Sequence, residues 1–143
     1  MWGICDANGY VYDFDVYCGK NSDKGLKLGK IAMGSRVVIQ MLNQLLTHTS
    51  PRKLCLYHLY FDNLFCCPDL MVHLKNLGLR ATGVVRSDRI REKNSIDKDA
   101  PKGTHAAKHD KNSGLNFITA RDSKDVSILS TAAGVSPQMP MKR

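Results

Sequence analysis

The chain has 143 residues, and its 21 lysines and arginines against 13 aspartates and glutamates give a formal net charge of +8. With 43% hydrophobic and 24% charged residues, its composition excludes collagen-like, mucin-like and wholly disordered proteins. No apolar run approaches the roughly 20 residues that span a bilayer, so we expect no membrane segment. The N-terminus lacks the pattern of a signal peptide, and the five cysteines are interpreted as reduced thiols of an intracellular protein.

The first predicted element is a β-hairpin. Residues Trp2 to Asp6 form a short apolar run, and Asn8-Gly9 supplies residues that adopt the backbone of a tight turn. The following segment, Tyr10 to Tyr17, alternates with the period of two that is typical of a half-buried strand. Tyr10, Tyr12, Phe14 and Val16 fall on one face of this segment. The other face carries Val11, Asp13, Asp15 and Tyr17.

A helix is predicted after a Gly- and Lys-rich loop over Gly19 to Gly34. Ser35 is a plausible N-cap, and the helix is expected to end at Thr47 to Pro51. Apolar side chains recur at helical spacing and predict a face that packs against another element; they are Val37, Val38, Met41, Leu42, Leu45 and Leu46.

The next segments predict a strand, a helix and another strand. Leu54 to Phe61 is nearly all apolar, which is typical of a strand covered on both faces. Pro68 fits the first position of a helix, and Gly78 fits the position after its last turn. Leu79 to Val85 returns to strand character. This order predicts an α/β fold with parallel pairings made through crossover connections.

The rest of the chain is expected to be less regular. Arg86 to Gly114 is charged and poor in large apolar residues, and we interpret it as a flexible basic loop. Leu115 to Thr119 and Val126 to Thr131 are predicted strands. The predicted organisation is therefore a core over residues 1–85, a loop over 86–114, and strands with a tail over 115–143.

Two aspartates are candidate metal ligands because of where they stand. Asp6 follows the first predicted strand, and Asp62 follows the apolar strand that ends at Phe61. If the two strands are parallel neighbours, their carboxyl ends meet at the sheet edge where α/β proteins hold ligands. Two adjacent carboxylates repel each other, so they need either a shared divalent cation such as Mg²⁺ or a raised pKa. The alternative is that Asp6 only begins the turn and Asp62 only precedes a helix.

At these positions the sequence resembles the piggyBac transposase family. Residues Ile4 to Phe14, followed by Tyr17 to Lys20, look like the segment that carries the first catalytic aspartate of the family. Residues Tyr60 to Phe65 are similar to the motif that carries the second one. Further similarity is found at Gly34 to Val38, Leu77 to Arg86 and Leu129 to Thr131.

This resemblance implies an RNase H-like fold, a mixed sheet with helices packed on it, which would be incomplete here and joined to part of a β-rich insertion. It implies that Asp6 and Asp62 are catalytic residues that bind Mg²⁺ or Mn²⁺ for DNA strand cleavage and joining. It also implies a DNA partner, a homodimer and a location in the nucleus. The third aspartate of the family lies in a Gly-Gly-Val-Asp motif that these 143 residues do not contain. We therefore expect an inactive remnant of a transposase domain.

Basic residues and thiols supply the remaining candidates. Arg86, Arg89 and Arg91 follow the strand beside the proposed site and are predicted to contact DNA phosphates, with a solvated charged loop as the alternative. A zinc site is not favoured, because its candidates lack two ligand pairs at tetrahedral spacing; they are Cys55, His58, Cys66, Cys67 and His73. Two further hypotheses stay open, namely a domesticated, non-enzymatic DNA- or chromatin-binding module and a chain without a stable fold.

Overall fold

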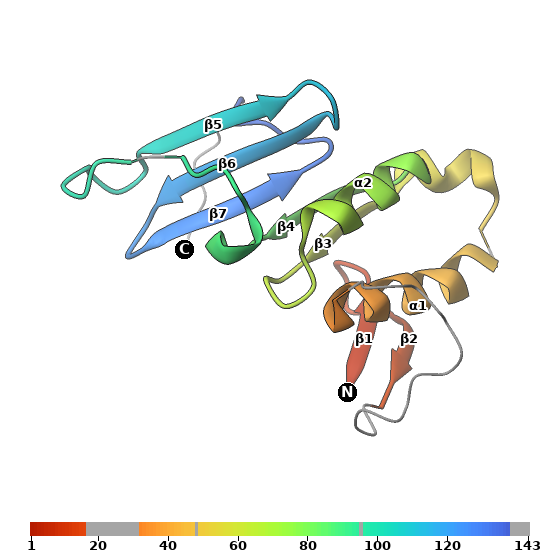
Figure 1. Cartoon of the computed structure of the whole chain (residues 1–143). Coiled ribbons are helices and arrows are strands. Elements are labelled where there is room, and N and C mark those ends of the chain that lie inside the picture. Colours follow the sequence, from red (N-terminus) through yellow and green to blue (C-terminus); the bar gives the residue numbers. More distant parts are fainter. Residues whose placement is uncertain (17–31, 48, 95, 138–143) are drawn as a thin grey trace. The chain divides into compact units, whose positions relative to one another are not determined.

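The computed structural model gives the arrangement of most of the chain and describes residues 1–16, 32–47, 49–94 and 96–137. Two compact units are present, Met1–Leu54 (unit 1) and Cys55–Arg143 (unit 2) (Figure 1). Each described unit contains strands and a helix, which confirms the predicted α/β class. Among the described residues, no helix has the length and apolar character needed to cross a membrane.

Unit 1 begins with the predicted hairpin. Strand β1 (Trp2–Cys5) pairs antiparallel with β2 (Val11–Asp15). Gly9 in the turn has a φ of +87°, a conformation that glycine adopts without the steric cost of a Cβ atom. The prediction of a turn at Asn8-Gly9 is confirmed.

The exposure of β2 is the opposite of what side-chain polarity suggests. Its aromatic face is open, with Tyr10 66% and Phe14 63% exposed, whereas Asp13 and Asp15 are half-buried. The acidic face lies toward the helix of unit 1, where Gln40 Nε2 donates a hydrogen bond of 3.0 Å to Asp15 Oδ2. The face of β2 that lies toward α1 is therefore the acidic one, and Asp15 has a hydrogen-bond partner there.

Helix α1 (Met33–Thr47) starts earlier than predicted. Ser35 lies inside its first turn and is fully buried, so the prediction that Ser35 caps the helix is wrong. The small side chains there permit close packing, and burial takes precedence over the capping preference of serine. The buried residues of α1 are Gly34, Ser35, Ile39, Met41 and Leu42. Most of the loop predicted over Gly19 to Gly34 lies outside the described residues.

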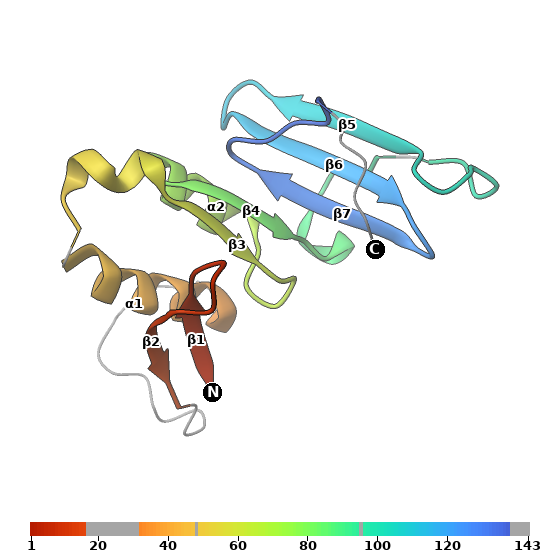
Figure 2. The same ribbon diagram turned by 180° about the vertical axis from the view of Figure 1, so that it is seen from behind.

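Unit 2 contains a mixed sheet with the strand order β3-β4-β7-β6-β5 (Figures 1 and 2). Strands β3 (His58–Phe61) and β4 (Arg80–Val84) are parallel and are connected through α2 (Pro68–Asn76). The other pairings, β4 with β7, β7 with β6 and β6 with β5, are antiparallel. The predicted parallel pair with a helical connection is confirmed.

The apolar segment Leu54 to Phe61 is only partly a strand, contrary to prediction. Its first residues belong to a 3-10 helix (Pro51–Leu56), and β3 is the outer strand of the five-stranded sheet, where Tyr60 is 72% exposed. An apolar run shows hydrophobic character but not how many of its faces are covered, because periodicity is absent from it.

Helix α2 has the predicted ends. Pro68 occupies its first turn, after Cys67 in an extended conformation. At the other end Gly78 has a φ of +82°, and its N–H donates to Lys75 O at 2.9 Å while Leu79 N donates to Leu74 O at 3.0 Å. The core of unit 2 forms between α2 and β4, and its buried members include Leu70, Met71, Leu74, Leu79 and Ala81.

The flexible loop predicted over residues 86–114 is wrong at two places. A short 3-10 helix covers Ser87–Arg89, and strand β5 (His105–Asp110) pairs along its length with β6 (Leu115–Arg121). Most side chains of β5 are exposed because it is an edge strand, so its sequence carries little apolar alternation. The strands predicted at Leu115 and Val126 are confirmed as β6 and β7 (Asp125–Ser130). The division into domains at residues 85 and 114 stays a prediction.

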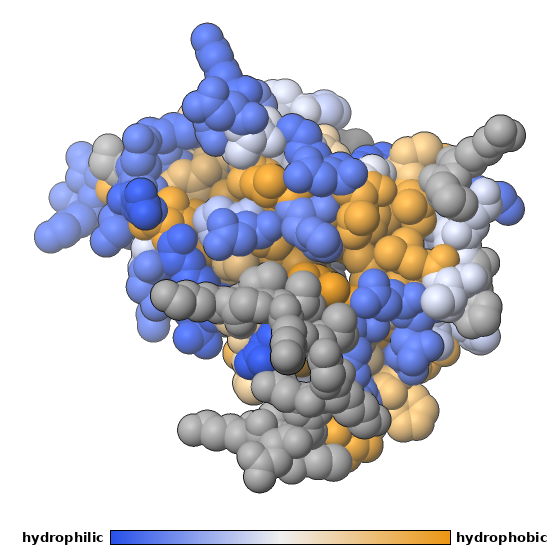
Figure 3. Space-filling model, turned by 45° about the vertical axis from the view of Figure 1, so that its right-hand side comes forward, coloured by the Kyte–Doolittle hydropathy of each residue, from blue (hydrophilic) through white to orange (hydrophobic). Residues whose placement is uncertain are grey.

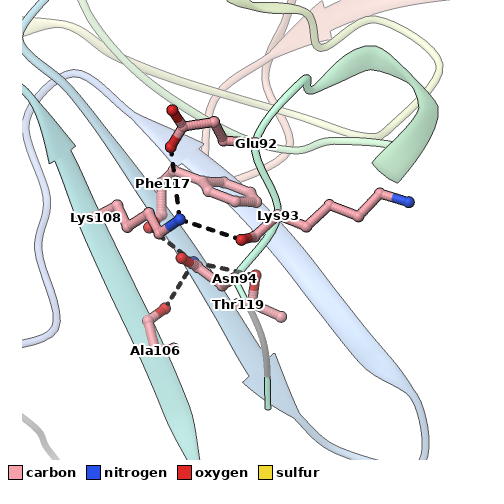
Figure 4. A network of polar contacts seen from close by, with 7 residues as sticks. All are labelled: Glu92, Lys93, Asn94, Ala106, Lys108, Phe117 and Thr119. Carbon is pink, nitrogen blue, oxygen red and sulfur yellow. Dashed lines mark hydrogen bonds and ion pairs between the residues drawn. The ribbon is translucent and has the colours of Figure 1, made fainter.

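Asn94 attaches the segment between β4 and β5 to the sheet (Figure 4). Its Nδ2 donates to Ala106 O at 3.0 Å, and it contacts Phe117 O and Thr119 Oγ1 at 3.3 Å each. Beside it, Lys108 Nζ donates to Lys93 O at 3.2 Å. The segment is therefore held across β5 and β6 by polar contacts.

Candidate functional site

Asp6 is half-buried at the end of β1 and shapes the hairpin turn. Its Oδ1 accepts hydrogen bonds from Asn8 N at 2.8 Å and Tyr10 N at 2.9 Å, and its backbone N–H donates to Tyr10 O. Asp6 therefore stabilises the turn through one carboxylate oxygen, Oδ1, as the alternative interpretation of the sequence predicted. These contacts hold the carboxylate at a defined place beside the turn.

Asp62 is exposed and directly follows β3, at the carboxyl end of the parallel pair of unit 2. Its Oδ1 accepts a hydrogen bond from Asn63 N at 2.6 Å, and its backbone carbonyl accepts from Phe65 N at 3.1 Å and Cys66 N at 3.3 Å. The chain thus turns tightly over residues 62–66, a segment named here the Asp62 loop. Ligands of α/β sheets are held in this position after a strand.

The two aspartates belong to different units, and their proximity stays a prediction. Within the described residues, no three or more His, Cys, Asp or Glu side chains form a group that could hold a metal ion. Carboxylate oxygens are nevertheless the hard ligands that Mg²⁺ and Mn²⁺ prefer, so each aspartate is chemically suited to such an ion.

The three arginines predicted to bind phosphate differ in their surroundings. Arg86 and Arg91 are exposed, as a phosphate contact requires. Arg89 is half-buried, and its Nη1 lies within hydrogen-bond distance of the backbone carbonyls of Asn63, Leu64 and Cys66, at 2.9, 3.2 and 2.8 Å. Arg89 is thus bonded to the Asp62 loop, a role that sequence reasoning missed. Contact of any of the three with DNA stays a prediction.

Two cysteines of unit 2, Cys55 and Cys66, differ in exposure. Cys66 is fully buried, and burial raises the pKa of its thiol to about 12; the neighbouring Cys67 acts in the same direction, whereas the charge of Arg89 acts against it. Cys55, in contrast, is exposed.

A row of polar side chains crosses one face of the sheet and was not predicted. His58 Nε2 lies 2.8 Å from Thr82 Oγ1, which lies 2.7 Å from Ser130 Oγ. The ring of His58 stacks on Tyr60 with centroids 4.3 Å apart. Partial burial, and secondarily the charge of Arg80, lower the pKa of His58. The paired register of β3, β4 and β7 creates this row, so only the strand pairing could have revealed it.

Ser130 has a structural role in this row. It is fully buried, and its Oγ accepts hydrogen bonds from Ala133 N at 2.8 Å and Ala132 N at 3.2 Å. The hydroxyl therefore shapes the chain that leaves β7, and burial keeps it from any substrate.

Comparison with known proteins establishes the family. The sequence pattern of the family described as "Transposase IS4" matches residues 1–143. The chain belongs to this transposase family. Human PiggyBac transposable element-derived protein 3 is 32% identical to the transposase-family chain over 143 residues, covering 96% of the chain and 23% of that protein. Human PiggyBac transposable element-derived protein 2 is 30% identical over 144 residues, with the same coverage.

The structural comparison confirms the fold. The solved piggyBac transposase synaptic complex with hairpin DNA matches the transposase-family chain with a TM-score of 0.60 and 21% identity, over 82% of this chain and 24% of that one. The predicted RNase H-like fold and the piggyBac resemblance are thereby confirmed. The transposase-family chain spans less than a quarter of the length of these relatives.

Proposed function

We propose that this chain is the part of a piggyBac-type transposase core that supplies Asp6 and Asp62 as ligands of a divalent metal ion for DNA strand cleavage and joining. The observation that carries the proposal is the place of Asp62, which is exposed directly after a parallel strand in a transposase-family fold. DNA as the partner is supported by the structural neighbour, which is a transposase complex with hairpin DNA. The proposed location is the nucleus, and a homodimer stays a prediction.

The chemistry of the two aspartates fits this role. A bound divalent ion would supply a Lewis acid for a nucleophile and for charge that develops at phosphorus. In each aspartate Oδ1 accepts backbone amides, at Asn8 and Tyr10 for Asp6 and at Asn63 for Asp62. Such contacts restrict the rotation of a carboxylate, and a restricted ligand loses less entropy when it binds an ion.

We propose further that these 143 residues do not cleave DNA by themselves. Two carboxylates neutralise less of the charge of a divalent metal ion than three do, and catalysis depends steeply on the placement of the reacting groups. A strand-cleavage assay with Mg²⁺ or Mn²⁺ should show no cutting above background. Cutting that disappears in Asp62→Ala would contradict this part of the proposal.

The metal sites can be tested with Mn²⁺ and the ¹⁵N-labelled chain. We expect Mn²⁺ to broaden the amide signals of Ala7 and Asn63, which are the neighbours of the two aspartates. Loss of a residue that only holds a metal ligand in place typically lowers metal affinity roughly 10- to 100-fold. Asp62→Asn removes a proposed ligand itself, so it should weaken Mn²⁺ binding by at least this factor. If both aspartates hold one ion, either single substitution should remove the broadening at both amides, and the double substitution should add little.

The exposed Asp99 provides a matched control for this experiment. Asp99→Asn removes the same charge and should leave the broadening at Ala7 and Asn63 unchanged. Broadening that follows every acidic residue alike, or that survives in both Asp6→Asn and Asp62→Asn, would contradict the proposed metal ligands.

The alternative is a non-enzymatic DNA- or chromatin-binding module, favoured by the net charge of +8 and the exposure of Arg86 and Arg91. Hydrophilic side chains also cover much of the face shown in Figure 3.

DNA binding can be tested by fluorescence anisotropy. We expect the chain to bind duplex DNA with an affinity that falls as the salt concentration rises. Each of Arg86→Ala and Arg91→Ala should lower the slope of log affinity against log salt concentration by about one, the change expected for the loss of one phosphate contact. Binding that Asp62→Asn leaves unchanged supports this alternative, and absence of binding at low salt contradicts it.

A further inference from the structure

Arg89 links two segments of unit 2 that are far apart in the sequence. It ends the 3-10 helix that follows β4, and its side chain reaches the Asp62 loop, which follows β3. There a single nitrogen, Nη1, lies 2.9, 3.2 and 2.8 Å from the carbonyl oxygens of Asn63, Leu64 and Cys66. All three contacts are with backbone, so they depend on the course of the loop and not on its side chains.

Convergent carbonyl groups need a donor between them. Their oxygens carry partial negative charge, and buried carbonyls without a partner are costly. Nη1 has two hydrogens, so the three carbonyls share two N–H groups, and the positive charge strengthens each contact. The amides of Asn63, Phe65 and Cys66 are already bonded to Asp62 itself. Arg89 therefore complements the internal bonds of the Asp62 loop from outside.

We propose that Arg89 is a positioning residue, which holds the Asp62 loop through these three carbonyls and so determines where the carboxylate of Asp62 lies. This proposal rests on the proposed role of Asp62 as a metal ligand. It gives Arg89 a role different from that of Arg86 and Arg91, whose exposed side chains are available to a phosphate. Nη1 of Arg89 is occupied by the loop.

The test uses amide hydrogen exchange of the full chain in the absence of metal. In Arg89→Met, which keeps a long side chain without donors, the amides of Phe65 and Cys66 should exchange about tenfold faster or more. The amides of Leu79 and Val85, bonded to Leu74 O and Ser127 O, report on the rest of unit 2 and should change little. Lys93→Met removes a charge from an exposed side chain four residues later in the sequence and should leave the loop amides unchanged.

Arg89→Lys is the informative conservative variant. The three carbonyls converge on one nitrogen, and the lysine ammonium carries three hydrogens on one nitrogen, so Arg89→Lys should restore most of the protection that Arg89→Met loses. In the same samples, the Mn²⁺ broadening at Asn63 should weaken in Arg89→Met and return in Arg89→Lys. A residue that served general stability alone would not produce this paired change at the loop and at the metal.

The outcomes separate this proposal from the function on which it rests. Unchanged exchange at Phe65 and Cys66 in Arg89→Met would overturn the role of Arg89, whatever Mn²⁺ does. An equal rise at Leu79 and Val85 would also overturn it, because Arg89 would then stabilise the whole unit. If the unaltered chain shows no Mn²⁺ effect at Asn63, Asp62 is not a metal ligand, and Arg89 then does not position one. The exchange data would still show whether Arg89 holds the Asp62 loop.

Discussion

Leu74→Ala is expected to reduce the free energy of unfolding of unit 2 by about 2–5 kcal/mol, the range observed when a buried leucine is truncated. Leu74 is fully buried in α2, three residues after Met71, which is fully buried as well, and α2 packs on β4. The substitution removes apolar surface from the core and leaves a cavity that a helix and a sheet already in contact can close only partly. Urea unfolding followed by circular dichroism measures the loss.

Two variants make this prediction specific. Leu74→Met nearly conserves the volume and should cost less than about 1.5 kcal/mol. Leu77→Ala makes the same chemical change at the residue that follows α2, where the side chain is 37% exposed, and should cost about 1 kcal/mol. Equal losses for Leu74→Ala and Leu77→Ala would contradict the prediction, because burial in the core would then not distinguish the two positions.

The elements that the sequence predicted best are those with local signals at their ends. Pro68 and Gly78 delimit α2 through backbone chemistry, and Gly9 does the same for the hairpin. These residues act through their own φ angle or missing N–H, so no knowledge of the rest of the fold is needed. Ser35 failed as a signal because a buried position, set by tertiary packing, overrode its capping preference.

Strand β5 shows why an edge strand is difficult to predict. Its residues pair in register with β6, from His105 opposite Ala120 to Asp110 opposite Leu115, but its side chains are mostly exposed. The stabilising contacts are backbone hydrogen bonds to a strand that comes later in the chain, and these leave no pattern in the side chains. The contacts of Asn94 are equally hard to predict from side-chain patterns, because two of its three partners are backbone carbonyls.

The candidate site was predictable only in part for a related reason. Asp62 could be placed after a strand from the apolar run before it, and the structure bears out that position. The bond between Arg89 and the Asp62 loop spans more than twenty residues and ends on carbonyl groups, which every residue type offers. Arg89 was therefore predicted to bind phosphate, although its N–H groups can equally donate to backbone carbonyl oxygens. The proximity of Asp6 and Asp62 depends on the placement of two units and stays a prediction.

Gly83→Ala is expected to cost about 1–3 kcal/mol, the range typical of overpacking, although it adds only one methyl group. Gly83 is buried in β4 opposite Phe61 of β3. A Cβ atom there would lie 2.7 Å from Cδ2 and 2.8 Å from Cε2 of the Phe61 ring, and 2.9 Å from its backbone oxygen. The ring can rotate away, but the carbonyl belongs to the strand, so β3 itself must shift.

That shift should be detectable at the candidate site, because Phe61 immediately precedes Asp62. We expect Gly83→Ala to change the NMR chemical shift of the Asn63 amide and to lower the urea concentration at the midpoint of unfolding. Gly134→Ala is the control, since no atom lies within 4 Å of its added Cβ, and it should change neither quantity. If the ring contributes to the strain, Phe61→Leu should be less costly in the Gly83→Ala background than in the unaltered chain. Recovery should remain incomplete, because the Phe61 carbonyl is unaffected, and full recovery would show that the side chain alone requires glycine at this position.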